Sequence, residues 1–127
     1  MIMASLLGGV GVVLFVCSYV LYQRVYDALI DTFPLELRDP HTSRFAIHPI
    51  ALSPSTPLAL QADYVKSEVG ICSALLAGVL SSFLFGNVVL GLAWSVVFLV
   101  SAVVTFRSWK AYKANRDRRI GHDDEEE

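Results

Sequence analysis

The chain has 127 residues and a formal net charge of −2, and 54% of its residues are hydrophobic. A water-soluble domain of this length is about 45–50% apolar and spreads its charges along the sequence. Here every charged side chain falls within residues 24–68 or 107–127. This separation argues against an ordinary water-soluble domain and leaves no room for a separate globular domain of usual size.

The first apolar run, Met1 to Gln23, contains no charged side chain. A cleavable secretory signal has basic residues in front of an apolar segment of about 7–15 residues. This run is longer and has no basic residue in front, so it predicts an uncleaved first span. The apolar spacing predicts that its helix continues to Asp31 or Thr32 and ends before Pro34. We therefore expect residues 1–33 to form a transmembrane helix with a cytoplasmic extension.

Prolines dominate the next segment, because all five of the chain lie within residues 34–57. Their spacing predicts an extended, Pro-rich cytoplasmic loop over residues 34–56. Thr56 followed by Pro57 is typical of a helix N-cap and first helical position. A helical lead-in is thus expected from Pro57, in which Asp63 and Lys66 are spaced to pair on the surface.

The longest charge-free stretch has 38 residues, from Val69 to Phe106. As one straight helix it would be about 57 Å long, whereas a bilayer hydrocarbon core is about 30 Å thick. Two spans, about 69–85 and 88–106, fit this length, with a turn at Gly86-Asn87. Residues 57–106 are therefore predicted to form the lead-in and a tight transmembrane hairpin.

The basic residues support the same count of three spans. Four lie within residues 24–68 and six within 107–127, and none lies before residue 24 or at the turn. Three spans place both basic zones on one side, which the positive-inside rule makes the cytoplasm. We expect an all-α integral membrane protein with a single N-terminal span and a C-terminal helical hairpin. Its N-terminus would be outside and its C-terminus cytoplasmic. The short chain without an Asn-x-Ser/Thr site favours a bacterial cytoplasmic (inner) membrane.

Small side chains recur in the second span at a spacing of four residues. Lipid gives helices no hydrophobic reason to associate, so small residues at this spacing provide a surface that another helix can approach closely. The predicted helix-packing residues are Gly70, Ala74, Gly78, Ser82 and Gly86, with Gly91 and Ser95 as counterparts in the third span. A second column beside them contains Ser73, Ala77 and Ser81. The partner surface is either the first or third span of the same chain or another subunit.

Aromatic and basic side chains alternate directly after the third span. Such residues are suited to the headgroup layer and to anionic lipids at the cytoplasmic face. The predicted lipid-interface residues are Arg107, Trp109, Lys110, Tyr112 and Lys113. Within residues 107–127 the acidic end is expected to be disordered over about the last eight residues. Its negative charge argues against a nucleic-acid partner.

No pattern indicates a reaction. None of the three histidines fits a zinc-binding spacing, and the chain has no nucleophile elbow or phosphate-binding glycine loop. We therefore assign no catalytic, cofactor-binding or metal-binding residue and expect a protein that is not an enzyme. No Asp, Glu, Lys, Arg or His lies inside a predicted span, which disfavours a proton-coupled transporter.

The order of segments resembles the universal stress protein B type of small bacterial membrane protein. The resemblance covers an N-terminal span followed by the Tyr- and Leu-rich stretch Tyr26-Asp-Ala-Leu-Ile-Asp-Thr-Phe-Pro34-Leu, a loop and a C-terminal span. This chain has an additional span. The resemblance implies no functional residue.

The most favoured function is an accessory, assembly or regulatory subunit, which either docks on a larger membrane protein or self-associates. A membrane-shaping hairpin is the first alternative, because the two hairpin spans are short and precede a basic interfacial segment. A minimal transporter or channel subunit is the second alternative.

Overall fold

The computed structural model describes residues 1–125, which are mostly helical and contain no strand. Three of the helices are long and one is short. Their bounds are α1 (Ile2–Leu29), α2 (Pro40–Ala51), α3 (Leu58–Leu84) and α4 (Val88–Glu125). Two single turns of 3-10 helix, η1 (Ile30–Thr32) and η2 (Leu35–Leu37), lie between α1 and α2. The all-α class predicted from the sequence is thus confirmed.

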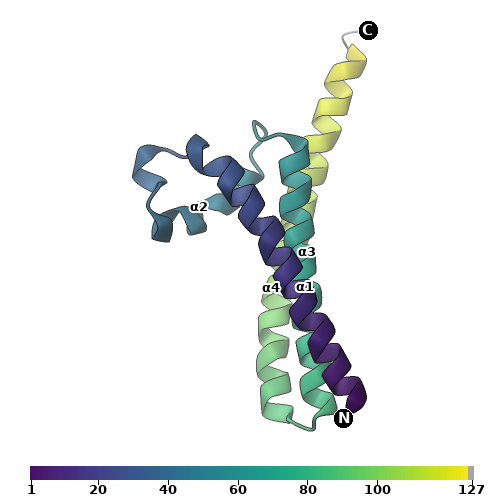
Figure 1. Cartoon of the computed structure of the whole chain (residues 1–127). Coiled ribbons are helices and arrows are strands. Elements are labelled where there is room, and N and C mark those ends of the chain that lie inside the picture. The colour runs from purple at the N-terminus through teal and green to yellow at the C-terminus, as the bar shows by residue number, and fades with distance from the viewer. Residues whose placement is uncertain (126–127) are drawn as a thin grey trace.

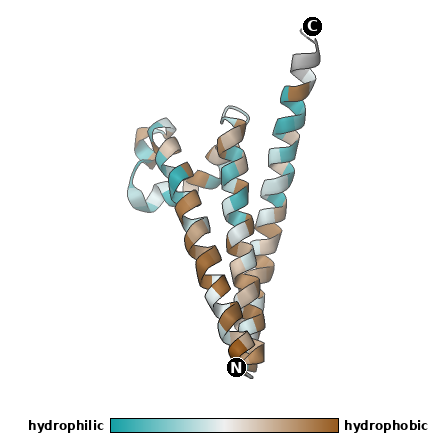
Figure 2. Cartoon of the chain, turned by 45° about the vertical axis from the view of Figure 1, so that its right-hand side comes forward, coloured by the Kyte–Doolittle hydropathy of each residue, from teal (hydrophilic) through white to brown (hydrophobic). Residues whose placement is uncertain are grey.

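The three long helices are each long and apolar enough to cross a membrane. Helix α3 is the central one, because it packs along both α1 and α4 (Figure 1). Apolar residues dominate the half of the molecule that contains the N-terminus, and hydrophilic residues dominate the other half (Figure 2). We call these halves the turn end, where α3 and α4 are joined, and the charged end.

The first helix ends close to where the sequence predicts. After Leu29 the chain continues as η1 to Thr32, whose hydroxyl donates a 2.6 Å hydrogen bond to the Leu29 carbonyl. Phe33 then adopts an extended conformation with φ −71° and ψ 143°. Because the ring of Pro34 disfavours a helical residue before it, this change of conformation is expected.

The expectation of an extended loop over residues 34–56 is wrong, because this segment contains α2. Pro40 occupies the first helical position, where the missing N–H costs nothing. Asp39 caps the helix by accepting a 3.2 Å hydrogen bond from the backbone N–H of His41. Pro49 lies inside the helix, close to its end. It removes one backbone hydrogen bond, and the packing of Ile47 and Ala51 against the other helices stabilises α2 in spite of this loss.

A small hydrophobic core gathers at the charged end of the molecule. It joins the end of α1, the segment that follows α1, helix α2 and the start of α3. Its buried members are Val25, Leu29, Phe33, Ile47, Ala51 and Tyr64. The segment between α1 and α3 therefore packs against the ends of these two helices.

The start of α3 differs from the prediction in one detail. Thr56 does not cap the helix, because its hydroxyl donates a 2.7 Å hydrogen bond to the carbonyl of Ile50. Pro57 is the N-cap residue and α3 begins at Leu58. The predicted surface pair does form, with 3.6 Å between Lys66 Nζ and Asp63 Oδ1.

The hairpin turn lies where the sequence predicts. Gly86 has φ +76°, a value that glycine adopts without strain, and Asn87 Oδ1 accepts a 3.1 Å hydrogen bond from the N–H of Leu90. At its other end α4 continues to Glu125. Residues 120–125 are helical where the sequence predicts disorder, and residues 126–127 lie outside the described part of the chain.

Candidate functional site

Helices α1 and α3 approach each other through small residues. A Cβ atom added to Gly70 would lie 1.8 Å from the hydroxyl oxygen of Ser18. A Cβ atom added to Gly11 would lie 3.2 Å from the Cβ of Ala77 and 3.3 Å from the carbonyl oxygen of Ala74. A side chain at either position would force a neighbouring group to move, so the two glycines permit the close approach of the helices.

The residues of α3 that meet α1 come from both small-residue columns. Gly70 and Ala74 belong to the first column, and Ala77 and Ser81 belong to the second. Four residues turn an α-helix by about 400°, so a column with this spacing drifts by about 40° at each step. A straight neighbouring helix therefore contacts residues of α3 that are alternately four and three positions apart in the sequence.

The remaining members of the first column, Gly78, Ser82 and Gly86, lie in different surroundings. A Cβ atom added to Gly78 would have the ring of Trp94 in α4 as its nearest neighbour, at 4.0 Å. Ser82 is 7% exposed, and its hydroxyl donates a 2.8 Å hydrogen bond to the Gly78 carbonyl. Gly86 has no other atom within 4 Å of an added Cβ atom, so it serves the turn and makes no helix contact.

The predicted counterparts in α4 lie near the turn end. Gly91 is buried, and a Cβ atom added to it would lie 2.9 Å from the ring of Phe83 in α3. The hydroxyl of Ser95 donates a 2.8 Å hydrogen bond to the Gly91 carbonyl within α4 itself. Gly91 thus makes room for an aromatic ring of the neighbouring helix.

An apolar groove of about 260 Å³ lies over α3, with walls from α1 and α4. Its lining residues are Gly8, Gly11, Val12, Phe15, Ala74, Leu75, Gly78 and Trp94. We call this the α3 groove. The sequence did not predict it, because its wall residues in α1 and α4 are more than 75 positions apart in the chain. Gly8 and Gly11 indicate that α1 can approach another helix closely, but the sequence does not identify that helix.

Two buried amide side chains join the helices at the charged end. Gln61 in α3 is fully buried, and its Nε2 donates hydrogen bonds to the carbonyls of Ser53 (3.1 Å) and Thr56 (2.8 Å). Asn115 in α4 donates to Gln61 Oε1 (2.9 Å) and to the carbonyl of Leu52 (2.8 Å). These bonds fasten the connection between α2 and α3 to the extension of α4.

Arg119 strengthens the same connection. Its guanidinium donates 2.8 Å hydrogen bonds to the carbonyls of Pro54 and Thr56. The sequence placed Arg119 only in a basic segment and gave no sign that it faces the protein. Gln61 and Asn115 were likewise not singled out, because a lone amide in a helix has no sequence signature of burial.

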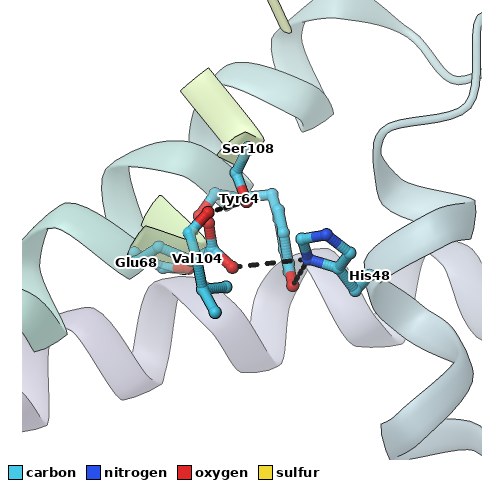
Figure 3. Close-up of polar contacts among 6 residues, drawn as sticks. His48, Tyr64, Glu68, Val104 and Ser108 are labelled. Atoms are coloured by element: carbon cyan, nitrogen blue, oxygen red, sulfur yellow. Dashed lines mark hydrogen bonds and ion pairs between the residues drawn. The ribbon is translucent and has the colours of Figure 1, made fainter. Parts of the chain in front are cut away.

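A histidine, a tyrosine and a glutamate meet between α2 and α3 (Figure 3). His48 Nδ1 lies 3.1 Å from the Tyr64 hydroxyl and 3.5 Å from Glu68 Oε1. The Glu68 side chain is 13% exposed, and its Oε2 is buried without a hydrogen-bond partner among the described residues. Nearby in α4, Ser108 donates to the Val104 carbonyl at 3.0 Å. The cluster links α2 to α3 by polar contacts beside the hydrophobic core.

This cluster has too few strong ligands for a metal centre of the usual kind. Within the described part of the chain, no three His, Cys, Asp or Glu side chains gather closely enough to hold a metal ion. The cluster also lies just before the charge-free part of α3, which begins at Val69. Its geometry is that of a helix-to-helix contact at the boundary of the apolar region.

The predicted lipid-interface residues of α4 follow one another on its surface. Arg107, Trp109, Lys110 and Lys113 are exposed, and Tyr112 is half-buried. The described side chains of the segment thus face outward for the most part, with the backbone continuing as a regular helix.

Comparisons with known proteins give no relative. No family model matches the chain, and neither the curated proteins nor the solved structures contain a match. The similarity to universal stress protein B therefore gains no support from them.

Proposed function

We propose that this chain is an accessory, assembly or regulatory subunit that binds a transmembrane helix of a larger membrane protein through the α3 groove. The observation that carries this proposal is the groove itself, which the chain's own helices leave open. Its lining is almost entirely apolar, and Gly78 and Ala74 form part of its surface. Because association in lipid depends on close packing, a groove with small residues favours a helix as the occupant.

The arrangement of the three spans supports this role. Much of the small-residue surface of α3 is already used inside the chain, by α1 at Gly70 and by α4 near Gly91. The α3 groove is therefore a further packing surface beside those that the chain uses internally. No catalytic residue, cofactor or metal is part of the proposal.

We also propose that the charged end faces the cytoplasm and that the N-terminus lies outside. The support is the distribution of Lys and Arg, all of which lie in residues 24–68 and 107–127. A bacterial inner membrane remains the proposed location.

The test fills the groove and leaves the fold intact. Gly78→Leu places a bulky side chain in the groove, where a Cβ atom meets nothing closer than 4.0 Å. Gly9→Leu is the matched control, because an added Cβ atom at Gly9 has no neighbour within 4 Å. A photoreactive amino acid at Val12, in the groove wall, reports the neighbour in native membranes. We expect Gly78→Leu to abolish a discrete adduct that Gly9→Leu retains.

An adduct that survives Gly78→Leu would contradict the proposal. An adduct between two copies of this chain would show that the chain self-associates through the groove and does not bind a larger membrane protein there. Ser82 is unsuitable for the test, although the sequence pattern suggests it, because it is buried against the chain's own helices. Thermal unfolding of both leucine variants checks that the fold is retained.

The membrane-shaping alternative requires a hairpin that enters the membrane without crossing it. The turn end of the hairpin lies beside the start of α1, because Ser81 contacts Ala4. From Ala4 to Gln23 the helix rises about 29 Å, close to the thickness of the hydrocarbon core. This depth supports a hairpin that crosses fully. Reaction of Asn87→Cys with an impermeant reagent from outside is expected, whereas protection would favour the wedge.

The transport alternative has a separate test. Ion or solute flux in liposomes that contain only this chain would favour a minimal transporter or channel subunit over an accessory one.

A further inference from the structure

On the exposed face of α4, where its apolar part meets the basic segment, lies a shallow, open depression of about 440 Å³ formed by side chains of α4 alone. Its lining residues are Leu99, Ala102, Val103, Phe106, Arg107 and Lys110. We call this the α4 groove. None of its lining residues belongs to the α3 groove, so the two surfaces are separate.

The α4 groove is apolar along its length and cationic at one end. Leu99, Val103 and Phe106 are each more than half exposed, at 61%, 54% and 55%. Arg107 and Lys110 follow them toward the charged end of the molecule. This order matches the structure of a phospholipid, whose acyl chains are apolar and whose phosphate is anionic.

The two cations of the α4 groove have no acidic partner among the side chains that the structure describes. Two basic residues elsewhere in the chain do form ion pairs, Lys66 with Asp63 and Arg116 with Asp117. Arg107 and Lys110 form no ion pair with any described carboxylate. Their charge is therefore available for an anion from outside the chain.

Aromatic rings hold the lysines of this segment close to the helix. The ammonium of Lys110 lies 5.2 Å from the centre of the Phe106 ring, and that of Lys113 lies 5.6 Å from the Trp109 ring. The rings of Phe106 and Trp109 are 6.3 Å apart. A lysine placed over a ring keeps its charge at the apolar boundary, which is the depth of the phosphate layer.

We propose that the α4 groove binds one anionic phospholipid, with an acyl chain along Val103 and Phe106 and the phosphate between Arg107 and Lys110. The apolar part of the groove favours a lipid over free phosphate, because free phosphate would leave that part uncovered. The binding requires only that α4 crosses the membrane, so it stands whether or not the α3 groove has a protein partner.

The native fluorescence of Trp109 gives a direct test. The chain has two tryptophans, so Trp94→Phe leaves Trp109 as the only one. The Trp94→Phe variant is placed in phosphatidylcholine vesicles that contain a small fraction of brominated phosphatidylglycerol or, in a separate experiment, of brominated phosphatidylcholine. We expect half-maximal quenching at about a tenfold lower fraction of the anionic lipid, since each cation near the surface favours it.

Two variants of equal charge separate a site from general attraction. Arg107→Gln with Lys110→Gln is expected to abolish the preference, whereas Arg116→Gln with Arg118→Gln is expected to keep it. The control pair removes the same charge farther along α4. If both double variants lost the preference for the anionic lipid equally, the proposed site would be overturned, because overall charge would then explain the binding.

A third variant tests the apolar part of the α4 groove. Val103→Phe fills the groove without changing any charge, and we expect it to lower the preference for the anionic lipid at least threefold. An unchanged preference would overturn the seating of an acyl chain there. Excess inorganic phosphate should not reverse the quenching difference, and a full reversal would show an anion site without lipid specificity.

Discussion

The hydroxyl of Ser81 in α3 donates a 2.8 Å hydrogen bond to the backbone carbonyl of Ala4 in α1. Both residues are buried, with exposed fractions of 8% and 1%. The bond joins residues 77 positions apart in the chain and sets the register of α1 along α3 at the turn end. Farther along the same interface, Gly11 and Gly70 allow the two backbones to stay close.

Loss of the Ser81 hydroxyl should have a small effect. Ser81→Ala is expected to lower the free energy of unfolding by about 0.6 kcal/mol and by no more than about 1.7 kcal/mol, the range for interhelical hydrogen bonds in membrane proteins. The control is Ser73→Ala, because Ser73 is exposed and bonds only to Val69 in its own helix. Unfolding in mixed detergent micelles measures both, and a larger loss in Ser73→Ala would contradict the assignment.

A larger side chain at Gly70 should separate α1 from α3. Gly70→Val is expected to reduce the free energy of unfolding by about 1–3 kcal/mol, the usual cost of overpacking. The steric conflict is with Ser18, which an added Cβ atom would approach to 1.8 Å. Gly9→Val introduces the same residue at an open position of α1. Equal unfolding curves for the two variants would show that the contact is absent in the membrane.

Gly91 and Phe83 should behave as a coupled pair. Gly91→Ala places a methyl group 2.9 Å from the Phe83 ring, so it should destabilise the hairpin. In the presence of Phe83→Leu the same change should cost less, because the smaller side chain leaves room. A double-mutant cycle on thermal unfolding is expected to give a coupling of about 0.5–3 kcal/mol. Additive effects would argue against the contact.

Removal of the Asn115 amide should loosen the charged end. Asn115→Ala leaves Gln61 Oε1 buried without its 2.9 Å partner, and the loss of such a partner costs about 1–3 kcal/mol. Hydrogen exchange should therefore become faster at the amide of Thr56, which donates to the Ser53 carbonyl in the connection between α2 and α3. Arg118→Gln is the control, since Arg118 is exposed on the same helix. Unchanged exchange in Asn115→Ala would contradict the coupling.

The spans and the turn were predictable because they depend on local properties of the chain. The charge-free stretches match the length that a bilayer requires, and Gly86 can adopt the positive φ that the turn needs. The end of α1 before Pro34 follows from the same kind of local rule. The groups involved are covalent neighbours or lie within one helix, so no knowledge of distant contacts was needed.

Helix α2 was not predictable, because its stability comes from distant residues. Pro49 inside the helix weakens its local preference, and packing against Val25 and Tyr64 compensates for this loss. The role of Arg119 was missed for the same reason, since this arginine donates to carbonyls of a loop more than 60 residues earlier.

The sequence by itself determined that the chain is helical, where its apolar spans lie and where the hairpin turns, because charge, length and backbone preference are properties of short segments. Only the tertiary structure decided which small residues meet and which remain open. The rotation of a helix is set by its neighbours, so Gly70 faces α1 while Gly78 lies in the α3 groove. The same packing turned Gln61 and Asn115, two ordinary polar residues, into a buried connection.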